Sequence, residues 1–427
     1  MELNDEPVTD GGLSRRDLLA GAVGAIGGAV LAGIPARALA QQQAAKAAPP
    51  PPPPAVPDDA TKLQGSPTSA VGTRSPFVKP SRTPFGDVTG SSLTPLQDLS
   101  GTITPADVHF ERHHAGIPLL DPARHTLVIH GLVERPLTFS VDDIKRFPQV
   151  TRIHFVECSG NGRAAYRDPK PETTAQRAAG LTANSEWTGV PLRLLFDEAG
   201  AKREASWFLA EGGDACLLTR SIPMEKARDD ALIVWAQNGE PLRPEQGFPL
   251  RLLLPGWEGN TNVKWLRRLE LGTRPWMTRW ETSKYTDPLS DGTARQFSFE
   301  MDAKSLITSL SFPMTIARGW RPVSGIAWTG RGKIRRVEFS ADGGKSWSDA
   351  ELHGPVLDKA HVRFSHMWKW DGAEAVVLSR ATDETGYVQP TRSELIRARG
   401  IGTDYHGNMI CGWKVQSDGR VFFHGET

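Results

Sequence analysis

The chain has 427 residues, with 50 Lys and Arg against 49 Asp and Glu and a formal net charge of +1. This length predicts two or three domains with ample core, and the balanced charge argues against nucleic acid or an anionic membrane surface as a partner. The three cysteines, Cys158, Cys216 and Cys411, form no Cys-x-x-Cys or Cys-x-x-Cys-His pattern, which excludes a zinc ribbon and a covalently attached c-type haem. Electron-transfer chemistry would therefore need another cofactor or another chain.

The first 40 residues have the pattern of an export signal. Arg15 and Arg16 precede a mildly apolar, Gly- and Ala-rich stretch over residues 20–33, and a small-residue cleavage site ends at Ala40. We therefore expect a twin-arginine signal peptide over residues 1–40 and a periplasmic protein. The alternative is a transmembrane anchor, but the stretch is short and rich in glycine for spanning a bilayer. We expect no stable membrane insertion.

Residues 41–98 are predicted to be a Pro-rich linker. A proline run covers Pro49–Pro54, and Ser, Thr, Gly and Pro dominate the residues after it. Polyproline is stiff and extended, and the rest has too few apolar clusters to bury a core. Ordered structure is expected to begin near Leu99.

Residues 99–295 mix strand and helix patterns. Residues 125–131 predict a strand, and Ser140 is a predicted N-cap for a short helix with acidic residues in its first turn. Residues 192–199 predict a second helix, and residues 248–254 predict a buried strand interrupted by one charge. Because no βαβ repeat and no GxGxxG or Walker motif is present, the pattern predicts an α+β domain.

Residues 296–401 change to an all-β pattern. Residues 335–348 predict a hairpin around an Ala-Asp-Gly-Gly turn, and residues 376–381 predict a further strand. Short strands at regular spacing predict an immunoglobulin-like β-sandwich, which is usually a packing or association module. Residues 402–427 form a C-terminal extension after it.

Cys158 lies where a predicted strand breaks into the small residues Ser159–Gly162. A thiol on such a turn is open to a ligand, and Arg152, Arg163 and Arg167 nearby would favour the thiolate. A thiolate can attack a substrate or bind a soft metal. The alternatives are a small buried hydrophobic residue, or thiol catalysis with a His base that the local sequence cannot place. One cysteine does not decide among these roles.

A set of spaced motifs in one order resembles the sulfite oxidase family of molybdenum enzymes. The resemblance covers residues 102–400, and a single motif would be far less specific. It implies a molybdopterin-binding domain followed by a β-sandwich dimerisation domain, with Mo-molybdopterin as cofactor. The motifs are Phe110–His114, the Cys158 turn, Glu211–Asp214, Gly247–Arg251, Asn262–Leu266, Tyr285 and the hairpin from Ser340 to Trp347.

The resemblance also implies a role for each motif residue. Cys158 would be the one protein ligand to molybdenum, Arg112 would face the substrate as well as the cofactor, and Tyr285 would stand beside the open coordination position. Soft thiolate ligation suits such a metal centre. The remaining residues implied to bind the pterin and its phosphate are Phe110, Glu111, His113, His114, Asp214, Gln246, Arg251, Asn262, Val263 and Lys264.

Some of these residues have other interpretations. Arg251 in an apolar strand could form an internal salt bridge, and Lys264 could be a solvated strand charge. His109, His113 and His114 could indicate zinc, although no further ligand pattern supports it.

Two positions depart from the sulfite-oxidising pattern. Gln246 stands where the family often has His, and His366 takes the place of an arginine that points into the anion pocket. Losing a permanent cation would weaken the capture of free sulfite and suit a larger substrate that presents one sulfur.

The departures favour the sulfane dehydrogenase branch of the family. The resemblance implies a sulfur-carrier protein as substrate, a separate c-type cytochrome subunit as electron acceptor, and a homodimer within a heterotetramer. The alternatives are a dehydrogenase that oxidises free sulfite, and an exported scaffold without a cofactor.

Overall fold

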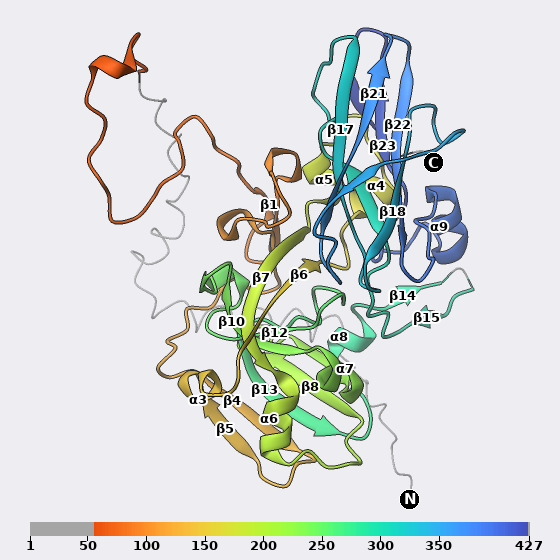
Figure 1. Ribbon diagram of the computed structural model, residues 1–427. Helices are drawn as coiled ribbons and strands as arrows, with labels where there is room; N and C mark the ends of the chain where they lie inside the picture. The colour runs from red at the N-terminus through yellow and green to blue at the C-terminus, as the bar shows by residue number, and fades with distance from the viewer. Residues whose placement is uncertain (1–54, 290, 426–427) are drawn as a thin grey trace, which may run out of the picture. The chain divides into compact units, whose positions relative to one another are not determined.

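The computed structural model describes residues 55–289 and 291–425 (Figure 1). The chain divides into two compact units, Met1–Lys79 and Pro80–Thr427. In the described part of the first unit, the regular structure is the 3-10 helix η1 (Ala60–Lys62), which the Asp59 side chain caps. The predicted export signal lies outside the described residues. Within them, no helix is long and apolar enough to cross a membrane.

The second unit begins earlier than its composition predicted. Residues 83–98, assigned above to the linker, form the strands β1 (Thr83–Gly86) and β2 (Gly90–Leu93) and the 3-10 helix η2 (Leu96–Asp98). Strand β2 pairs with both β1 and β3 (Glu111–His113). The ordered start near Leu99 is therefore wrong, because Leu93 and Leu96 are buried despite the polar composition around them.

Two larger sheets and several short helices build the domain predicted over residues 99–295, called the mixed domain below. One sheet has the order β5-β4-β13-β8-β9, in which only β4 and β13 run parallel, and the other has the order β11-β10-β7-β6 with β12 beside β10. This mixed arrangement confirms the α+β prediction. The strands are β4 (Thr126–Gly131), β5 (Leu137–Ser140), β6 (Val150–Glu157), β7 (Thr182–Pro191), β8 (Trp207–Gly212), β9 (Thr219–Pro223), β10 (Leu232–Gln237), β11 (Glu240–Pro241), β12 (Arg251–Leu253) and β13 (Leu266–Gly272).

The helices begin and end where local chemistry dictates. Ser140 and Asp143 form a capping box at the start of α3 (Val141–Lys145), and α6 (Leu192–Ala199) ends at Gly200 in the left-handed conformation. Both helices were predicted, whereas the strand expected over residues 248–254 is shorter. The other helical segments here are η3 (Ala106–Val108), α4 (Arg163–Arg167), α5 (Ala175–Ala179), α7 (Met224–Asp229), η4 (Pro244–Gln246) and α8 (Arg279–Thr282).

Two further sheets form the predicted β-sandwich. Their orders are β16-β17-β21-β20 and β19-β18-β22-β23-β24. The predicted hairpin is confirmed, since β18 pairs antiparallel with β19 across a turn whose Ser346 amide donates to Asp342. A short pair, β14 (Asp287–Pro288) and β15 (Ala294–Arg295), precedes the sandwich. The sandwich elements are β16 (Lys304–Ile307), β17 (Gly319–Trp328), β18 (Ile334–Ser340), β19 (Ser348–Asp349), β20 (Glu351–His353), β21 (Val362–Trp370), β22 (Ala375–Asp383), α9 (Arg392–Arg399), β23 (Gly412–Val415) and β24 (Val421–His424).

The C-terminal extension is an integral part of the sandwich. Strand β23 pairs with β22, and β24 pairs with β23, so residues 412–424 complete one of the two sheets. Trp413 is fully buried there, and its indole N–H donates to the Ile307 carbonyl at 2.9 Å.

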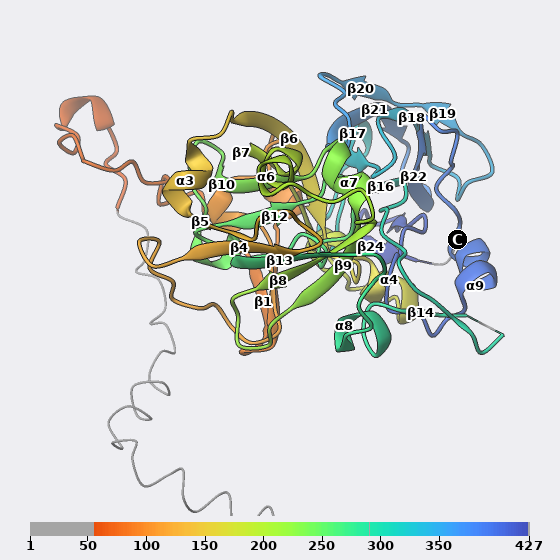
Figure 2. The ribbon, with the colours of Figure 1, turned by 90° about the horizontal axis from the view of Figure 1, so that it is seen from below.

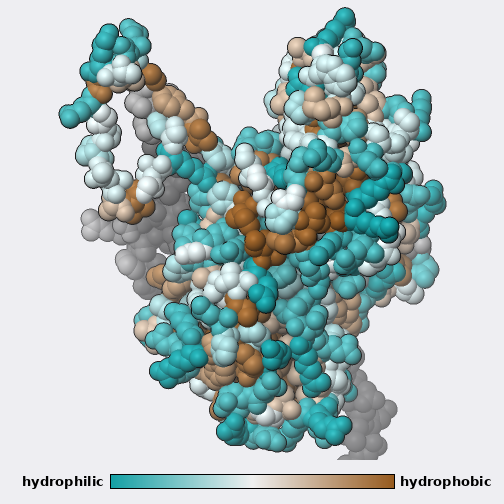
Figure 3. Space-filling view, viewed as in Figure 1, coloured by the Kyte–Doolittle hydropathy of each residue, from teal (hydrophilic) through white to brown (hydrophobic). Residues whose placement is uncertain are grey.

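One continuous hydrophobic core joins the sandwich to the mixed domain. It runs from Trp328 and Trp413 in the sandwich to Phe155 and Tyr166 beside the Cys158 turn. The long strands β6 and β7 reach toward the sandwich in two views (Figures 1 and 2). On one face, hydrophobic residues gather where the sandwich adjoins this domain, while most of the remaining surface is hydrophilic (Figure 3).

The core contact of Leu96 tests where the folded unit begins. Leu96 is only 3% exposed and packs in the shared core, whereas Leu63 is 63% exposed. We expect Leu96→Ala to lower the free energy of unfolding by about 2–4 kcal/mol through loss of apolar contacts and an unfilled cavity. Leu63→Ala is the matched control and should have little effect. Denaturant unfolding measures the free energy of unfolding of both variants. Equal values would contradict the assignment of residues 83–98 to the folded unit.

His361 predicts an acid-dependent loss of stability. It is buried between Phe155 and Trp328 and its ring contacts Thr182 at 2.9 Å. Burial, with a smaller effect from nearby Arg363, lowers the pKa of His361 from 6.5 to about 3. The unfolded chain therefore takes up a proton below pH 6.5 that the folded chain excludes, and stability falls as the pH drops through this window. For this one histidine, the free energy of unfolding is expected to fall by about 2 kcal/mol between pH 6.5 and pH 5.

The measurement is the pH dependence of denaturant unfolding in the wild type and in His361→Gln. The variant should have a shallower slope over this window, whatever its stability at neutral pH. Parallel slopes would contradict the assignment.

Candidate active site

The Cys158 turn is held by backbone contacts on both sides. Strand β6 ends at Glu157, the Cys158 amide donates to the Leu181 carbonyl at 2.9 Å, and the Cys158 carbonyl accepts from Asn161 at 2.8 Å. Gly162 then adopts a φ of +91° and starts α4. A Cβ at Gly162 would lie 2.3 Å from the Gly407 carbonyl oxygen, so the turn requires glycine there. The sulfur is consequently presented from a fixed backbone.

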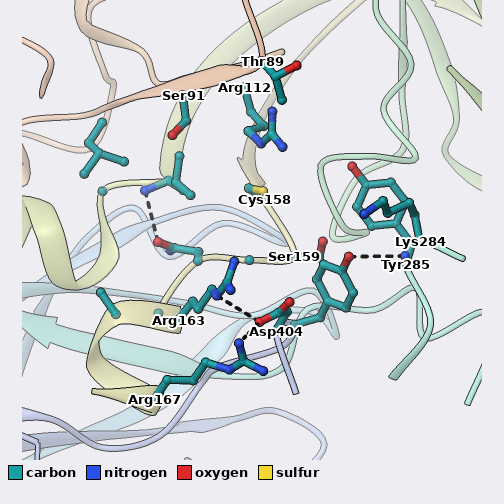
Figure 4. A pocket seen from close by; sticks show the side chains of 18 of the residues that line it. Thr89, Ser91, Arg112, Cys158, Ser159, Arg163, Arg167, Lys284, Tyr285 and Asp404 are labelled. Carbon is teal, nitrogen blue, oxygen red and sulfur yellow. Dashed lines mark hydrogen bonds and ion pairs between the residues drawn. The ribbon is translucent and has the colours of Figure 1, made fainter. Parts of the chain in front are cut away.

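Two adjoining cavities meet at this sulfur. The larger has a volume of about 790 Å³ and the smaller about 60 Å³. Arg112, His114, Cys158 and Tyr285 line both cavities and therefore mark the boundary between them. Figure 4 shows Arg112 and Tyr285 near Cys158, from separate parts of the chain. We call the smaller space the inner cavity and the larger one the outer cavity.

The inner cavity gathers most of the residues implied by the resemblance. Val263 is the exception, because its side chain is 0% exposed in the hydrophobic core and does not line the cavity. Trp265 also lines it and lies in the Asn262–Leu266 motif, although it was assigned no role. Sequence reasoning missed Val156, Leu218 and Asn260, whose apolar or amide side chains carry no distinctive signal. The predicted residues that line the inner cavity are Phe110, Glu111, Arg112, His113, His114, Cys158, Asp214, Gln246, Arg251, Asn262, Lys264 and Tyr285.

Arg251 is a buried cation with no carboxylate partner among the described residues. Its Nη1 donates to the Gln246 backbone and side-chain oxygens at 3.3 and 3.1 Å, while its Nε has no hydrogen-bond partner. Burial lowers the pKa of Arg251 to about 9. The internal salt bridge considered above is therefore absent from the described structure. A buried cation in this state favours an anionic ligand.

Lys264 is a second basic residue of the inner cavity, and it is half-buried. Its Nζ donates to the Arg112 and Glu245 carbonyls and lies 2.8 Å from His113 Nδ1. Burial, with the charge of Arg251 adding to it, lowers the pKa of Lys264 well below its ordinary value. Lys264 is thus not the solvated surface charge that its strand position allowed.

His113 and His109 contact a carboxylate and a backbone carbonyl rather than a cluster of metal ligands. His113 Nε2 lies 2.7 Å from Glu111, and His109 is fully buried with Nδ1 at 2.9 Å from the Phe110 carbonyl. In the described ranges, no group of three or more His, Cys, Asp or Glu residues could hold a metal ion. The zinc interpretation therefore has no support from the described residues.

Tyr285 stands at the boundary as a neutral hydrogen-bond donor. Burial raises its pKa far above the ordinary value, and its oxygen lies 2.7 Å from His114 Nε2. Burial and the charge of Arg112 lower the pKa of His114 to about 4, so the imidazole is neutral. Arg112 Nη2 lies 3.4 Å from His114 Nδ1 and can only donate. We therefore assign the His114 proton to Nε2, which leaves the Tyr285 hydroxyl proton free for a ligand.

A buried ionic cluster supports Tyr285 from behind. Arg220 is fully buried, with its guanidinium 5.0 Å from the Tyr285 ring centroid. It donates to Glu281 through Nε and Nη2 and to Glu258 through Nη1. These contacts fix the ring without placing a charge on the phenol.

Most of the charged residues that line the outer cavity are cations. Its carboxylates are Asp168 and Asp404, and Asp404 belongs to the segment between α9 and β23. The lining cations are Arg112, Arg163, Arg167, Lys170, Arg177, Arg279 and Lys284. Such a lining favours an anionic ligand.

His366 does not take part in this cavity, and the expectation that it replaces a pocket arginine is wrong. Its ring stacks on Phe339 with centroids 4.4 Å apart, and its Nδ1 lies 3.1 Å from the Asp349 carbonyl in the sandwich. Asp404 and Tyr405 line the outer cavity from the sandwich side instead. Sequence reasoning missed both because they fall in the supposed extension. The available signal was the run of polar and aromatic residues after Gly402.

Comparisons with known proteins relate the chain to molybdopterin enzymes. Two family models match the chain, an oxidoreductase molybdopterin binding domain over residues 114–280 and a Mo-co oxidoreductase dimerisation domain over residues 295–411. The structure is similar to that of the sulfane dehydrogenase SoxCD from Paracoccus pantotrophus, with 43% identity and a TM-score of 0.80 over 87% of this chain and 99% of that chain. The chain is a molybdopterin oxidoreductase of the sulfite oxidase family.

Curated members of the family are more distant. Mitochondrial sulfite oxidase of Rattus norvegicus is 29% identical over 70% of this chain and 59% of its own length. The NADH nitrate reductase of Ulva prolifera is 31% identical over 68% of this chain and 38% of its own length. The chain thus spans less than two thirds of these relatives.

The residues of the inner cavity fit the molybdopterin cofactor of the family. The unpartnered Nε of Arg251 and the amino group of Lys264 are donors suited to a phosphate or a polar pterin edge. Asn262 is held in place, since its Oδ1 accepts from the Leu254 amide at 2.7 Å. Cys158 would supply the thiolate that holds molybdenum, a soft ligand that this metal centre accepts.

Arg251 predicts opposite effects on cofactor content and on apoprotein stability. We expect Arg251→Met to lower the molybdenum and pterin content several-fold, because the variant lacks the guanidinium donors. The apoprotein should become more stable by about 1–3 kcal/mol, because a buried cation without a carboxylate is removed. Metal analysis, pterin fluorescence and denaturant unfolding measure these quantities.

Arg268→Met is the matched control, because Arg268 pairs with Glu211 outside both cavities. It should retain full cofactor content. Full cofactor content in Arg251→Met would contradict the role proposed for Arg251.

Proposed function

We propose that the chain is the molybdenum-containing catalytic subunit of a periplasmic sulfane dehydrogenase, which oxidises sulfane sulfur bound to a carrier protein. The similarity to the sulfane dehydrogenase SoxCD over 99% of that chain carries the proposal. The outer cavity of about 790 Å³ supports it, because a free sulfite ion would fill only a small part of this space. A sulfur atom on the end of a larger substrate has room to reach Cys158 and Tyr285.

The boundary residues have distinct roles in this proposal. When bound, the molybdenum cofactor supplies two-electron oxidation–reduction chemistry. Cys158 would hold the metal and would not attack the substrate. Arg112 would orient an anionic sulfur group through charge-assisted hydrogen bonds, and Tyr285 would donate its free hydroxyl proton as a hydrogen bond without adding charge.

The electrons would pass to a separate c-type cytochrome. The sequence has no Cys-x-x-Cys-His motif of its own, and a twin-arginine motif precedes the cleavage site at Ala40. These features support a periplasmic complex in which another subunit carries the haem.

A homodimer within that complex would form through the sandwich. Trp320 is 67% exposed and Met367 is 55% exposed, on the neighbouring strands β17 and β21. Exposed large apolar side chains that adjoin each other favour a protein interface. The match to a dimerisation domain over residues 295–411 supports the sandwich as the part of the chain that forms the dimer.

A dehydrogenase of free sulfite is the second candidate. The cations of the outer cavity favour it, since sulfite is a small anion, and curated relatives include sulfite oxidase. The same cavity also carries Asp404, which counters part of this charge.

Turnover by the holoprotein decides between the candidates. We expect fast reduction of cytochrome c with carrier-bound sulfane sulfur and at least about tenfold slower reduction with free sulfite, a difference of about 1.4 kcal/mol in transition-state binding. Cys158→Ser should fold, lack molybdenum and reduce no cytochrome with either substrate. Fast turnover of sulfite with none of carrier-bound sulfane would exclude the first proposal. A folded wild type without molybdenum or pterin would exclude both.

A further inference from the structure

The segment Thr403–Asn408 returns from the sandwich to the active site. The His406 amide donates to the Ser159 carbonyl at 2.8 Å, next to the proposed metal ligand. The Tyr285 amide donates to the Tyr405 hydroxyl at 3.4 Å. Figure 4 shows Asp404 facing Arg163 and Arg167 in the outer cavity. We call this segment the return loop.

The carboxylate of Asp404 holds two arginines at once. Its Oδ1 lies 2.9 Å from Arg163 Nε and 2.8 Å from Arg167 Nη1. Arg163 and Arg167 are the first and last residues of α4 and lie four residues apart, so their side chains emerge on the same face of the helix. Both line the outer cavity, and α4 follows the Cys158 turn directly.

The position of Asp404 is fixed by its surroundings. The Tyr166 hydroxyl donates to the Gly400 carbonyl at 2.8 Å, and Arg167 donates to the Gly402 carbonyl. Gly407 packs against Gly162 with no room for a side chain on the latter. The return loop is thus anchored on both sides of Asp404.

We propose that Asp404 is a specificity-determining residue that stops the outer cavity from retaining small free dianions. Two guanidinium groups close to the reaction centre would otherwise form a strong site for sulfite or sulfate. Because Asp404 is tethered beside them, a free dianion must displace its carboxylate to reach the same donors. A sulfur group delivered by a larger substrate gains its binding energy elsewhere and avoids this competition. The inference rests on the proposed function for its biological sense.

Asp404 differs from Asp168, the other acidic residue of the outer cavity, in the cations with which it pairs. Asp168 also lines the outer cavity but pairs with Lys170, and both side chains are well exposed at 70% and 65%. The Asp404 side chain is 37% exposed and Arg167 is 34% exposed. Removing either carboxylate changes the cavity charge by the same amount, and only removal of Asp404 frees Arg163 and Arg167.

Inorganic sulfate is the probe, used on purified holoprotein in two measurements. One is the sulfate dissociation constant from the shift in melting temperature, and the other is the KM for sulfite with cytochrome c. In Asp404→Asn we expect both constants to fall about two- to fivefold, the effect of freeing donors from a half-exposed ion pair. Asp168→Asn is the matched control and should change each constant by less than about twofold, because its ion pair with Lys170 is mostly exposed to solvent.

The double variant Arg163→Gln and Asp404→Asn tests whether Arg163 is one of the donors that bind sulfate. The gain in sulfate affinity should be largely lost in this double variant, because one of the two freed guanidinium groups is gone. Sulfate binding in Asp404→Asn that equals the wild type, or equals Asp168→Asn, would overturn the proposal.

Two controls keep the proposal falsifiable. If Asp404→Asn does not fold, the single variant Arg163→Gln tests the proposal instead. Sulfate affinity equal to that of the wild type would support it, because Asp404 already occupies the Arg163 guanidinium. Weaker sulfate affinity would overturn the proposal. The melting-temperature measurement needs no turnover. Absence of activity on any sulfur substrate would therefore count against the proposed function, while the sulfate constants alone would still judge Asp404.

Discussion

A single buried carboxylate, Glu157, ties the Cys158 turn to the sandwich. It accepts from Trp328 Nε1 at 2.6 Å and from Asn161 at 2.8 Å, and Lys304 Nζ lies 3.1 Å from it. Trp328 and Lys304 belong to the sandwich, and Cys158 is the next residue in the chain. Loss of one partner from such a buried pair costs about 3–5 kcal/mol. The position of the sulfur therefore depends on the docking of both domains.

The same logic separates the two kinds of charge around the site. Glu157 and Arg220 are paired within the protein, and their partners form the rigid wall behind Cys158 and Tyr285. Arg251 and Lys264 have only neutral oxygens and a histidine nitrogen as partners among the described residues. A protein that holds uncompensated cations in one cavity gains from an anionic cofactor there, which couples cofactor binding to folding.

The sequence allowed much of the site to be predicted, because its residues lie in short motifs. Arg251 stood out as a charge in an apolar strand, and Cys158 as a thiol before a glycine turn. Val263 was included only as a neighbour of Asn262 and Lys264, and in the loop between β12 and β13 its apolar side chain packs into the core instead. Leu93 and Leu96 were missed because polar composition concealed two buried residues. Asp404 and Tyr405 were missed because their partners lie more than a hundred residues away.

The two domains contribute residues to different cavities of the site. The mixed domain supplies the residues of the inner cavity, where the motifs are. The sandwich returns its own chain to the outer cavity, so that Asp404 meets Arg163 and Tyr405 meets Tyr285. A loop on a separate domain can change without disturbing the cations that suit the cofactor. In the proposed function, substrate choice would therefore depend on the return loop, and cofactor binding on the inner cavity.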